Sequence, residues 1–291
     1  MLLVAVSATS ISALLVRYAE AEGAPGIVTA MWRTVFAAAL VLPLALWRGL
    51  ADIAALSARE RLLLAASGVA LGLHFAAYIV SLYFTTVAST MFFVAITPIF
   101  VALGSHWVLR ERVAPLFWIA IIVTVIGGLL IVGVDVKELK KIHGDALALA
   151  AGLFVTVYLL IGRTLRPKLH VLSYIGATYT LAALTTTAAT LVLREPIVGY
   201  APRAWLMFAL LAVGPSIVGH GSYNWALRHF ASYVISVVNL GEPVIAILLA
   251  YFFLAETPTP MKLVGGAVLL LGISLAIYFT RQAEAPAPAG P

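Results

Sequence analysis

Cysteine is absent from the 291-residue sequence, and charged residues make up only 10% of it. The absence of cysteine excludes disulfides, iron–sulfur clusters and thiolate metal sites, and we expect no other metal site or cofactor. Soluble domains typically have about 25% charged residues, whereas 63% of this chain is hydrophobic. Because so little polar surface cannot cover a globule, the composition predicts an integral membrane protein whose exterior mostly faces lipid.

The charges that are present lie in short clusters. The net charge of +6, taken alone, is compatible with nucleic-acid binding. The Lys and Arg residues sit between apolar runs, however, which is typical of cytoplasmic loops and of contacts with lipid headgroups. We therefore expect a lipid bilayer, and no nucleic acid, as partner. We expect no cleavable signal peptide. The first apolar run is short and begins at Met1, and a slightly truncated start of the chain would explain this.

Apolar stretches long enough to cross a bilayer as helices, about 20 residues each, recur along the whole chain. Charged or turn-rich breaks separate ten of them, near 2–17, 27–47, 62–83, 86–109, 115–133, 145–162, 171–193, 204–227, 231–254 and 261–279. No stretch resembles a soluble domain. The sequence therefore predicts an all-α integral membrane fold with ten transmembrane helices, and the Ala/Pro-rich tail at 281–291 is expected to be disordered.

The distribution of Lys and Arg over the short loops predicts the orientation. With the N-terminus inside, the outer loops hold seven of them, and Arg33 lies within a span. The inner loops and the tail hold ten, namely Arg48, Arg59, Arg61, Arg110, Arg112, Arg163, Arg166, Lys168, Arg228 and Arg281. This small excess favours a multi-pass protein of the inner (plasma) membrane with both termini in the cytoplasm.

Two stretches of the chain have proline, glutamate and proline at the same spacing and lie 145 residues apart. They are ITPIFVALGSHWVLRERVAP at 96–115 and GEPVIAILLAYFFLAETPTP at 241–260. The matched pairs at this offset are Pro98/Pro243, Glu111/Glu256, Pro115/Pro260, Tyr78/Tyr223, Leu82/Leu227 and Gly127/Gly272. They align the third to fifth spans with the eighth to tenth. Five spans per copy place the second copy upside down in the membrane, which predicts inverted five-helix repeats at 1–143 and 144–280. Such repeats are typical of alternating-access transporters.

The repeat carries a resemblance to a known family. A duplicated five-helix unit, with P-x(12)-E-x(3)-P closing its fourth helix and a glycine-rich fifth helix, resembles the EamA-type drug/metabolite transporter superfamily. The second copy is the closer match, with EPVIAILLAYFFLAE at 242–256 and GGAVLLLGISL at 265–275, while the first copy has Thr97 where the second has Glu242. The resemblance implies ten helices, cytoplasmic termini and export of small metabolites. In architecture and aromatic content the chain is also similar to bacterial aromatic amino acid exporters.

Polar residues lie along one face of the third span. Ser67, His74, Tyr78, Ser81 and Thr85 fall at offsets of 0, 7, 11, 14 and 18, which at about 100° per residue form one narrow stripe. Polar groups inside a span are costly and therefore candidates for function, although many only join helices.

The eighth span carries a similar stripe of Ser216, His220 and Tyr223, with Asn224 at its edge. Since the two spans are repeat partners, their stripes are expected to face each other. One interpretation is a central cavity, and the other is a hydrogen-bonded seam between closed helices. The residues predicted to line the cavity from these spans are His74, Tyr78, Ser81, His220, Tyr223 and Asn224.

The ninth span places Asn239 and Glu242 near mid-depth, with Gly241 and Pro243 weakening the helix beside them. Non-helical backbone at this depth is tolerated only where it is buried or lines a cavity. We therefore predict a substrate-binding role for Asn239 and Glu242, with Pro243 as a hinge and Pro98 as its equivalent in the fourth span. The alternative is a structural kink beside a protonated Glu242.

Arg33, six residues inside the second span, is the only basic group at depth. It suits a substrate carboxylate, and it could instead snorkel outward or pair with Glu242. Phe154 and Tyr158 share a helix face at i, i+4 and are predicted to add aromatic surface to the site. Together with the His and Tyr stripes, they suit a ring-bearing zwitterion better than a sugar or a phosphate.

Glu111 and Glu256 close the fourth and ninth helices, and Pro115 and Pro260 mark the start of the next ones. A glutamate opposes the dipole at a helix C-terminus. We expect each to form a structural corner by accepting hydrogen bonds from the first backbone N–H groups of the following helix.

The function best supported by the sequence is a secondary-active or facilitative exporter of small metabolites, most simply neutral or aromatic amino acids. Export of drugs or other metabolites is the alternative within the same fold. An intramembrane enzyme is the alternative from a different class, but no enzyme is expected, because H-E-x-x-H, G-x-S-x-G and G-x-G-D are absent from the sequence. The absence of a Walker motif excludes transport driven by ATP bound to this chain. A channel is a further alternative. The transporter is expected to be a monomer, and its coupling is left open between protons, carried by His74, His220 or Glu242, and uncoupled diffusion.

Overall fold

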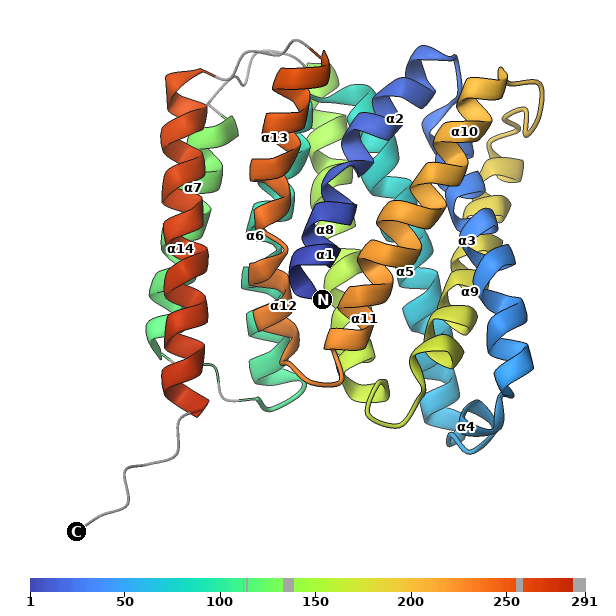
Figure 1. Cartoon of the computed structure of the whole chain (residues 1–291), viewed down its shortest axis with the longest axis horizontal. Helices are drawn as coiled ribbons and strands as arrows, with labels where there is room; N and C mark the ends of the chain where they lie inside the picture. Colours follow the sequence, from blue (N-terminus) through green and yellow to red (C-terminus); the bar gives the residue numbers. More distant parts are fainter. Residues whose placement is uncertain (112, 114, 133–138, 255–258, 285–291) are drawn as a thin grey trace.

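A computed structural model of the chain describes residues 1–111, 113, 115–132, 139–254 and 259–284. This part of the chain consists of helices and short connections and contains no strand (Figure 1). The helices of the first half are α1 (Leu2–Ser10), α2 (Ser12–Ala21), α3 (Gly26–Arg48), α4 (Ala51–Ala54), α5 (Ala58–Phe84), α6 (Val87–Trp107) and α7 (Pro115–Val132). Those of the second half are α8 (Leu139–Leu165), α9 (Val171–Val192), α10 (Pro202–Leu211), the π-helix η1 (Ala212–His220), α11 (Gly221–Ala226), α12 (Ser232–Val238), α13 (Gly241–Leu254) and α14 (Pro260–Glu284).

Each predicted apolar stretch coincides with one helix or with a run of consecutive helices. Six segments of the described chain are long and apolar enough to cross a membrane: Leu2–Ala21, Gly26–Arg48, Ala58–Phe84, Ile142–Leu165, Val171–Val192 and Pro202–Ala226. Pro115–Leu130 and Leu263–Ala276 form shorter apolar helices. With these spans the chain is a multi-pass membrane protein.

Two predicted boundaries differ from the observed helices. The division between residues 143 and 144 falls inside α8, which begins at Leu139. The helix α14 continues to Glu284, so the first four residues of the predicted disordered tail are helical. The rest of that tail, 285–291, lies outside the described residues.

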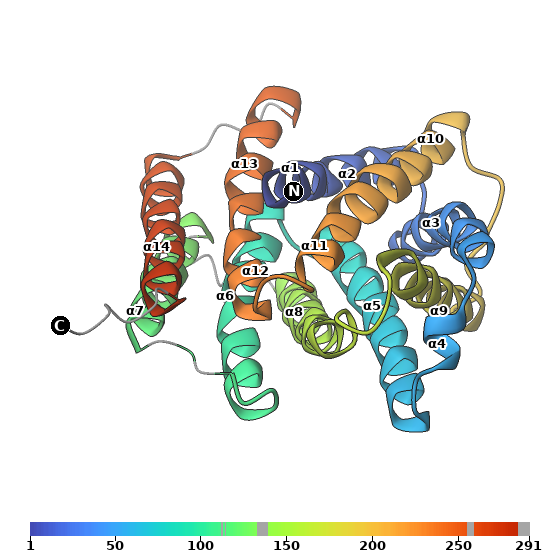
Figure 2. The same ribbon diagram turned by 60° about the horizontal axis from the view of Figure 1, so that its bottom comes forward.

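The helices form two facing rows with a pair of helices at each side. One row, here the first row, contains α1, α2, α10, η1, α11, α12 and α13, and the second row contains α5, α6 and α8 (Figure 2). The pair α7/α14 flanks the rows on one side, and the pair α3/α9 flanks them on the other (Figure 2). Connections alternate between an upper and a lower end as drawn in Figure 1, and α4 lies at the lower end.

The contacts within one row have counterparts in the other. In the second row α8 packs against α5 and α6, and in the first row α1 packs against η1 and α13. The flanking helix α9 contacts α5 of the second row, as α3 contacts η1 of the first. The rows enclose a shared core to which both contribute buried apolar side chains.

Two glycines bring α7 and α14 into close contact. A Cβ atom on Gly127 would lie 2.4 Å from the backbone N of Leu269, and one on Gly272 would lie 2.7 Å from the backbone N of Thr124. The offset of 145 relates Thr124 to Leu269 and Gly127 to Gly272. The two contacts are therefore reciprocal, as in an interface with a twofold axis.

Three segments between the flanking pairs depart from α-helical geometry. The helix is interrupted at Ile11 between α1 and α2, and at Asn239 and Leu240 between α12 and α13. The π-helix η1 contains Pro215, which has no backbone N–H to donate, and Ser216 Oγ donates to Leu211 O at 3.1 Å. All three segments lie beside the same central space.

Candidate functional site

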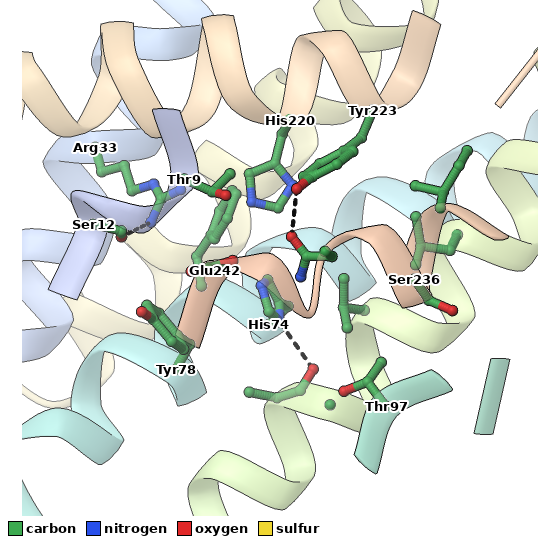
Figure 3. A pocket seen from close by; sticks show the side chains of 17 residues that line it. Thr9, Ser12, Arg33, His74, Tyr78, Thr97, His220, Tyr223, Ser236 and Glu242 are labelled. Carbon is green, nitrogen blue, oxygen red and sulfur yellow. Dashed lines mark hydrogen bonds between the residues drawn. The ribbon is translucent and has the colours of Figure 1, made fainter. Parts of the chain in front are cut away.

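A small cavity lies between the two rows (Figure 3). It offers about 60 Å³ of space for the centres of water molecules, which is room for only a few waters. Eight lining residues come from the first row: Thr9, Ser12, His220, Tyr223, Ile235, Ser236, Asn239 and Glu242. Eight come from the second row, His74, Phe75, Tyr78, Thr97, Ala151, Gly152, Val155 and Leu159, and Arg33 enters from α3. None of them is exposed on the surface of the molecule.

Arg33 is the cation of this cavity, and its side chain is only 1% exposed. Its Nε donates to Ser216 Oγ at 2.8 Å and its Nη1 donates to Ser12 Oγ at 3.2 Å. The guanidinium carbon lies 3.9 Å from the centroid of the Phe75 ring, a cation–π contact. The side chain therefore does not snorkel to the membrane surface, and two serines and an aromatic ring hold it at depth.

Glu242 is the acidic residue of the cavity and is 8% exposed. It lies in the first turn of α13, directly after the interruption at Asn239 and Leu240. Tyr223 Oη donates to Asn239 Oδ1 at 2.6 Å, which fixes the neighbouring amide (Figure 3). None of the ion pairs among the described residues joins Arg33 to Glu242. The cavity thus holds a basic and an acidic side chain that form no ion pair with each other.

The two predicted histidines meet at the centre of the cavity. Their ring centroids lie 6.0 Å apart, and His74 Nδ1 makes a hydrogen bond of 2.9 Å with the carbonyl oxygen of Ala151 in α8 (Figure 3). His220 packs edge-on against Phe75 with the centroids 5.0 Å apart. Phe75 of the second row and His220 of the first row occupy equivalent positions at the 145-residue offset. Their contact therefore joins equivalent positions of the two rows.

Tyr78 contributes a hydroxyl without a hydrogen-bond partner among the described residues. Its side chain is 4% exposed, and its ring stacks on His74 with the centroids 6.0 Å apart. Buried hydroxyls normally have a partner, because an unsatisfied one costs about 1–3 kcal/mol. An unsatisfied hydroxyl that lines a cavity beside Arg33 is an available donor or acceptor for a bound molecule.

Four predicted site residues do not line this cavity. Ser81 Oγ donates to Tyr78 O at 2.7 Å and lies 3.2 Å from Thr90 Oγ1, inside the second row. Tyr158 Oη donates to Asn224 Oδ1 at 2.7 Å, and neither residue lines the cavity. Phe154 is half-buried, and α8 turns Ala151, Gly152, Val155 and Leu159 toward the cavity instead.

The residues predicted as hinges and corners are partly described. The helix α6 runs without interruption through Pro98, whereas the interruption before α13 is two residues from Pro243, whose side chain lies outside the described set. The helices α7 and α14 begin at Pro115 and Pro260, and Glu256 lies outside the described residues. Glu111 Oε1 accepts from Arg163 Nε at 2.9 Å, so its observed partner is a side chain of α8 and not a backbone N–H of α7.

Sequence reasoning missed Thr9, Ser12 and Phe75 as lining residues. Thr9 and Ser12 flank the interruption at Ile11, for which the sequence gives no Gly or Pro signal. Phe75 follows His74 directly, and the offset of 145 to His220 was the available signal.

The site can bind and orient a small molecule with charges of both signs. Arg33 uses two of its five N–H groups in the described hydrogen bonds, Tyr78 adds a hydroxyl, and Glu242 supplies a carboxyl group. Val155, Leu159 and Ile235 give the cavity an apolar side. Among the described residues no group of His, Asp and Glu is arranged to hold a metal ion.

Comparisons with known proteins agree with this architecture. The sequence profile of the EamA-like transporter family matches residues 1–133 and 142–278. A protein of Synechocystis sp. that is described as an uncharacterized transporter is 23% identical over 69% of this chain and 63% of its own length. An uncharacterized transporter of Archaeoglobus fulgidus is 32% identical over 25% of this chain and 27% of its own length. The chain thus spans less than two thirds of the relatives that it matches. A solved crystal structure has a TM-score of 0.77 at 18% identity, and the match covers 98% of this chain and 97% of that one, which is a likeness of fold.

Proposed function

We propose that this chain, which belongs to the EamA-like transporter family, is a membrane transporter of a small molecule and that it exports amino acids, neutral or aromatic, by alternating access. The observation that carries the proposal is the cavity between the two rows, with a buried cation, a carboxyl group and an unsatisfied hydroxyl. We assign the α-carboxylate of the substrate to Arg33 and Tyr78, and its ammonium group to Glu242.

The charges of the cavity fit a zwitterion. A guanidinium matches a carboxylate with two parallel donors. None of the ion pairs among the described residues joins Arg33 to Glu242, so we infer that the two groups bind opposite ends of a substrate. The apolar side formed by Val155, Leu159 and Ile235 suits a neutral side chain. A cavity of about 60 Å³ is too small for an aromatic amino acid, so we infer that the rows separate when substrate is bound or released.

Alternating access rests on a fold of ten spans in two inverted five-helix repeats, which we also propose. Three features support it: the counterpart contacts of the two rows, the reciprocal glycines of α7 and α14, and the pairing of Phe75 with His220. The interruptions at Ile11 and at Asn239 and the π-helix η1 lie beside the cavity. Discontinuous helices near the midplane are typical of substrate sites in secondary transporters.

The remaining proposals concern the setting of the protein. From the distribution of Lys and Arg we propose that the chain resides in the inner membrane with both termini in the cytoplasm, and that it acts as a monomer. Glu242, with His74 and His220 near it, is the group that we propose to carry a proton in exchange for substrate.

The proposal is tested with purified protein in liposomes. Vesicles loaded with an unlabelled amino acid are diluted into the same labelled amino acid, and neutral and aromatic amino acids, sugars and cationic drugs are compared. We expect counterflow of one or more neutral or aromatic amino acids, with saturation, and none in protein-free vesicles. Counterflow of only sugars or drugs would overturn the substrate assignment, and conductance without saturation would overturn the carrier.

The same vesicles test proton coupling. With a pH gradient imposed across the membrane, we expect uphill accumulation by the wild type. The Glu242→Gln variant is expected to bind substrate more weakly, and to lose this accumulation even at substrate concentrations that restore its counterflow, because a neutral amide cannot exchange a proton. Accumulation that is equal in both proteins would rule out Glu242 as the proton carrier.

A further inference from the structure

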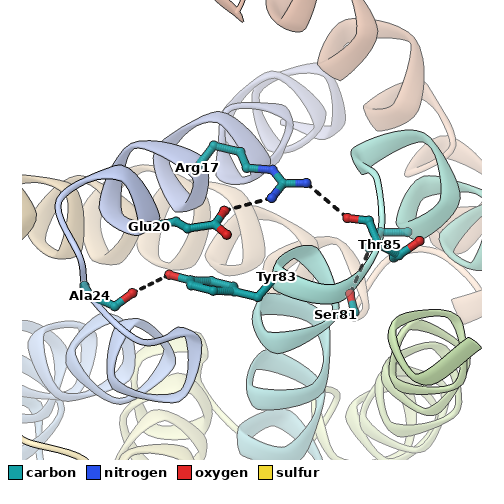
Figure 4. Close-up of polar contacts among 7 residues, drawn as sticks. Arg17, Glu20, Ala24, Ser81, Tyr83 and Thr85 are labelled. Carbon is teal, nitrogen blue, oxygen red and sulfur yellow. Dashed lines mark hydrogen bonds and ion pairs between the residues drawn. The ribbon is translucent and has the colours of Figure 1, made fainter. Parts of the chain in front are cut away.

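An arginine joins the two rows at the upper end of the molecule. Arg17 lies in α2 of the first row, and its Nη2 donates to the carbonyl oxygen of Thr85 at 3.0 Å (Figure 4). Thr85 is the C-cap residue of α5 in the second row. Arg17 therefore crosses between the rows above the cavity.

A second arginine makes the corresponding contact at the lower end. Arg163 lies in α8 of the second row, and its Nη1 donates to the carbonyl oxygen of Leu227 at 3.1 Å. Leu227 is the C-cap residue of α11 in the first row. The direction of the contact is thus reversed, from the second row to the first.

Both acceptors are suited to a cation. The last carbonyl groups of a helix have no partner within the helix and carry the negative end of its dipole. A charge-assisted bond of this kind contributes more than a neutral one, but it is lost entirely when the donor moves away.

A carboxylate from the same row holds each guanidinium. Arg17 Nη1 donates to Glu20 Oε2 at 2.8 Å, three residues along the same helix (Figure 4). Arg163 Nε donates to Glu111 Oε1 at 2.9 Å, in the connection that follows α6 of the second row. Each arginine can therefore leave its carbonyl acceptor and stay paired with its glutamate.

The two contacts occupy related places in the sequence. The offset of 145 relates Arg163 to Tyr18, the neighbour of Arg17, and relates Leu227 to Leu82, one turn before Thr85. The offset therefore relates the two contacts to within one helical turn, but it does not align them residue for residue. The chain thus has one crossing arginine at each end of the two rows.

We propose that Arg17 and Arg163 are opposed latches that set which end of the transporter opens. This inference rests on the proposed alternating access. When the rows separate at the upper end, the bond from Arg17 to Thr85 breaks while that from Arg163 to Leu227 holds, and the reverse occurs at the lower end. Removing one latch therefore favours the state that is open at its own end.

The natural absence of cysteine allows the test to use single-cysteine reporters without further changes. Ala13, 3% exposed, precedes Arg17 by one turn on the same helix face. Ala226, 0% exposed, directly precedes Leu227, the acceptor of Arg163, and does not line the cavity. Ala13→Cys reports opening at the upper end and Ala226→Cys reports opening at the lower end. Each reporter is labelled with a membrane-impermeant maleimide, which is added to either side of proteoliposomes of known orientation.

Arg17→Gln is expected to raise the labelling rate of Ala13→Cys about tenfold and to lower that of Ala226→Cys. Arg163→Gln is expected to do the opposite. The double variant is expected to return both rates toward those of the parent. Arg203→Gln is the matched control, because Arg203 lies at the upper end with its side chain 83% exposed and 3.9 Å from Glu22. It should change neither rate.

Arg163→Gln removes the cation from Glu111, so Arg163→Gln with Glu111→Gln is measured beside it as a neutral pair and should give the same shift. Rates that rise at both ends in a single variant, or that do not change, would overturn the latches while leaving alternating access intact. In the parent protein, a substrate that shows counterflow should change the two labelling rates in opposite directions, and rates that change in the same direction would overturn alternating access as well. Reciprocal labelling without amino acid counterflow would support the latches and reject only the substrate.

Discussion

At the scale of single residues, we expect the hydroxyl of Tyr78 to contribute to substrate binding and not to the stability of the fold. The hydroxyl of Tyr78 makes no hydrogen bond of good geometry with the described residues and lines a cavity with room for water, so replacing it by hydrogen removes no strong hydrogen bond within the protein. We predict that Tyr78→Phe leaves the melting temperature unchanged or raises it, while the affinity for the transported amino acid falls by about tenfold, the equivalent of one hydrogen bond of about 1.4 kcal/mol. Thermal melting in detergent and the concentration dependence of counterflow measure the two effects.

Tyr174→Phe is the matched control for this prediction. Tyr174 Oη lies 2.7 Å from Ser67 Oγ, and its ring is buried outside the cavity. Its loss leaves Ser67 without that partner, so we expect a lower melting temperature and unchanged affinity. A fall in stability with unchanged affinity in Tyr78→Phe would contradict the assignment of Tyr78 to the substrate.

The spacing of polar residues on one helix can be read from the sequence. His74 and Tyr78 recur at helical spacing on α5, and both line the cavity, whereas Ser81 of the same stripe does not. The surroundings of Arg33 were not predictable, because Ser12 and Ser216 come from helices far away in sequence. In α8 the sequence predicts a role for the aromatic residues Phe154 and Tyr158, whereas the small residues Ala151 and Gly152 line the cavity.

At the scale of helices, the crossing of α7 and α14 depends on two glycines. The Cβ of an alanine at Gly127 or Gly272 would lie within 3 Å of backbone atoms of the opposite helix, so the helices would have to move apart. We predict that Gly127→Ala and Gly272→Ala each destabilise the protein by about 1–3 kcal/mol. Because the contacts are reciprocal, the two values should be similar.

Gly266→Ala in α14 is the control, since no atom lies within 4 Å of its Cβ position, and alanine favours the helix. Denaturation in increasing SDS, followed by circular dichroism, measures all three variants. Equal stability of Gly127→Ala and Gly266→Ala would show that the crossing is not constrained by Gly127.

Helix positions follow from hydrophobic runs, and their irregularities do not. The apolar run at 204–227 predicts one continuous helix, while the chain forms α10, η1 and α11 there. Pro215 lies within the π-helix. A proline inside an apolar run predicts that the regular backbone hydrogen bonds of the helix are disturbed, but it does not predict a π-helix. The interruption at Ile11 has no local signal, because it depends on the packing of α1 and α2 against other helices.

At the scale of the whole molecule, orientation decides which latch faces the cytoplasm. Ten Lys and Arg residues on the proposed inner side and seven on the outer side give only a small excess. Ala55, in the lower connection after α4, and Val198, in the upper connection after α9, are both exposed. Single-cysteine variants at these positions can therefore be labelled from water without opening the transporter.

We predict that in intact cells an impermeant maleimide labels Val198→Cys and not Ala55→Cys, and that both are labelled once the membrane is permeabilised. This places the lower end, with Arg163, Glu111 and the C-terminus of α14, in the cytoplasm. In that orientation Arg17 closes the external side, so Arg17→Gln should favour release outward and Arg163→Gln should favour uptake from the cytoplasm. Labelling of Ala55→Cys alone in intact cells would show that the protein has the opposite orientation in the membrane. The two arginines would then exchange these roles, because the latch mechanism requires one arginine at each end and does not depend on the direction of export.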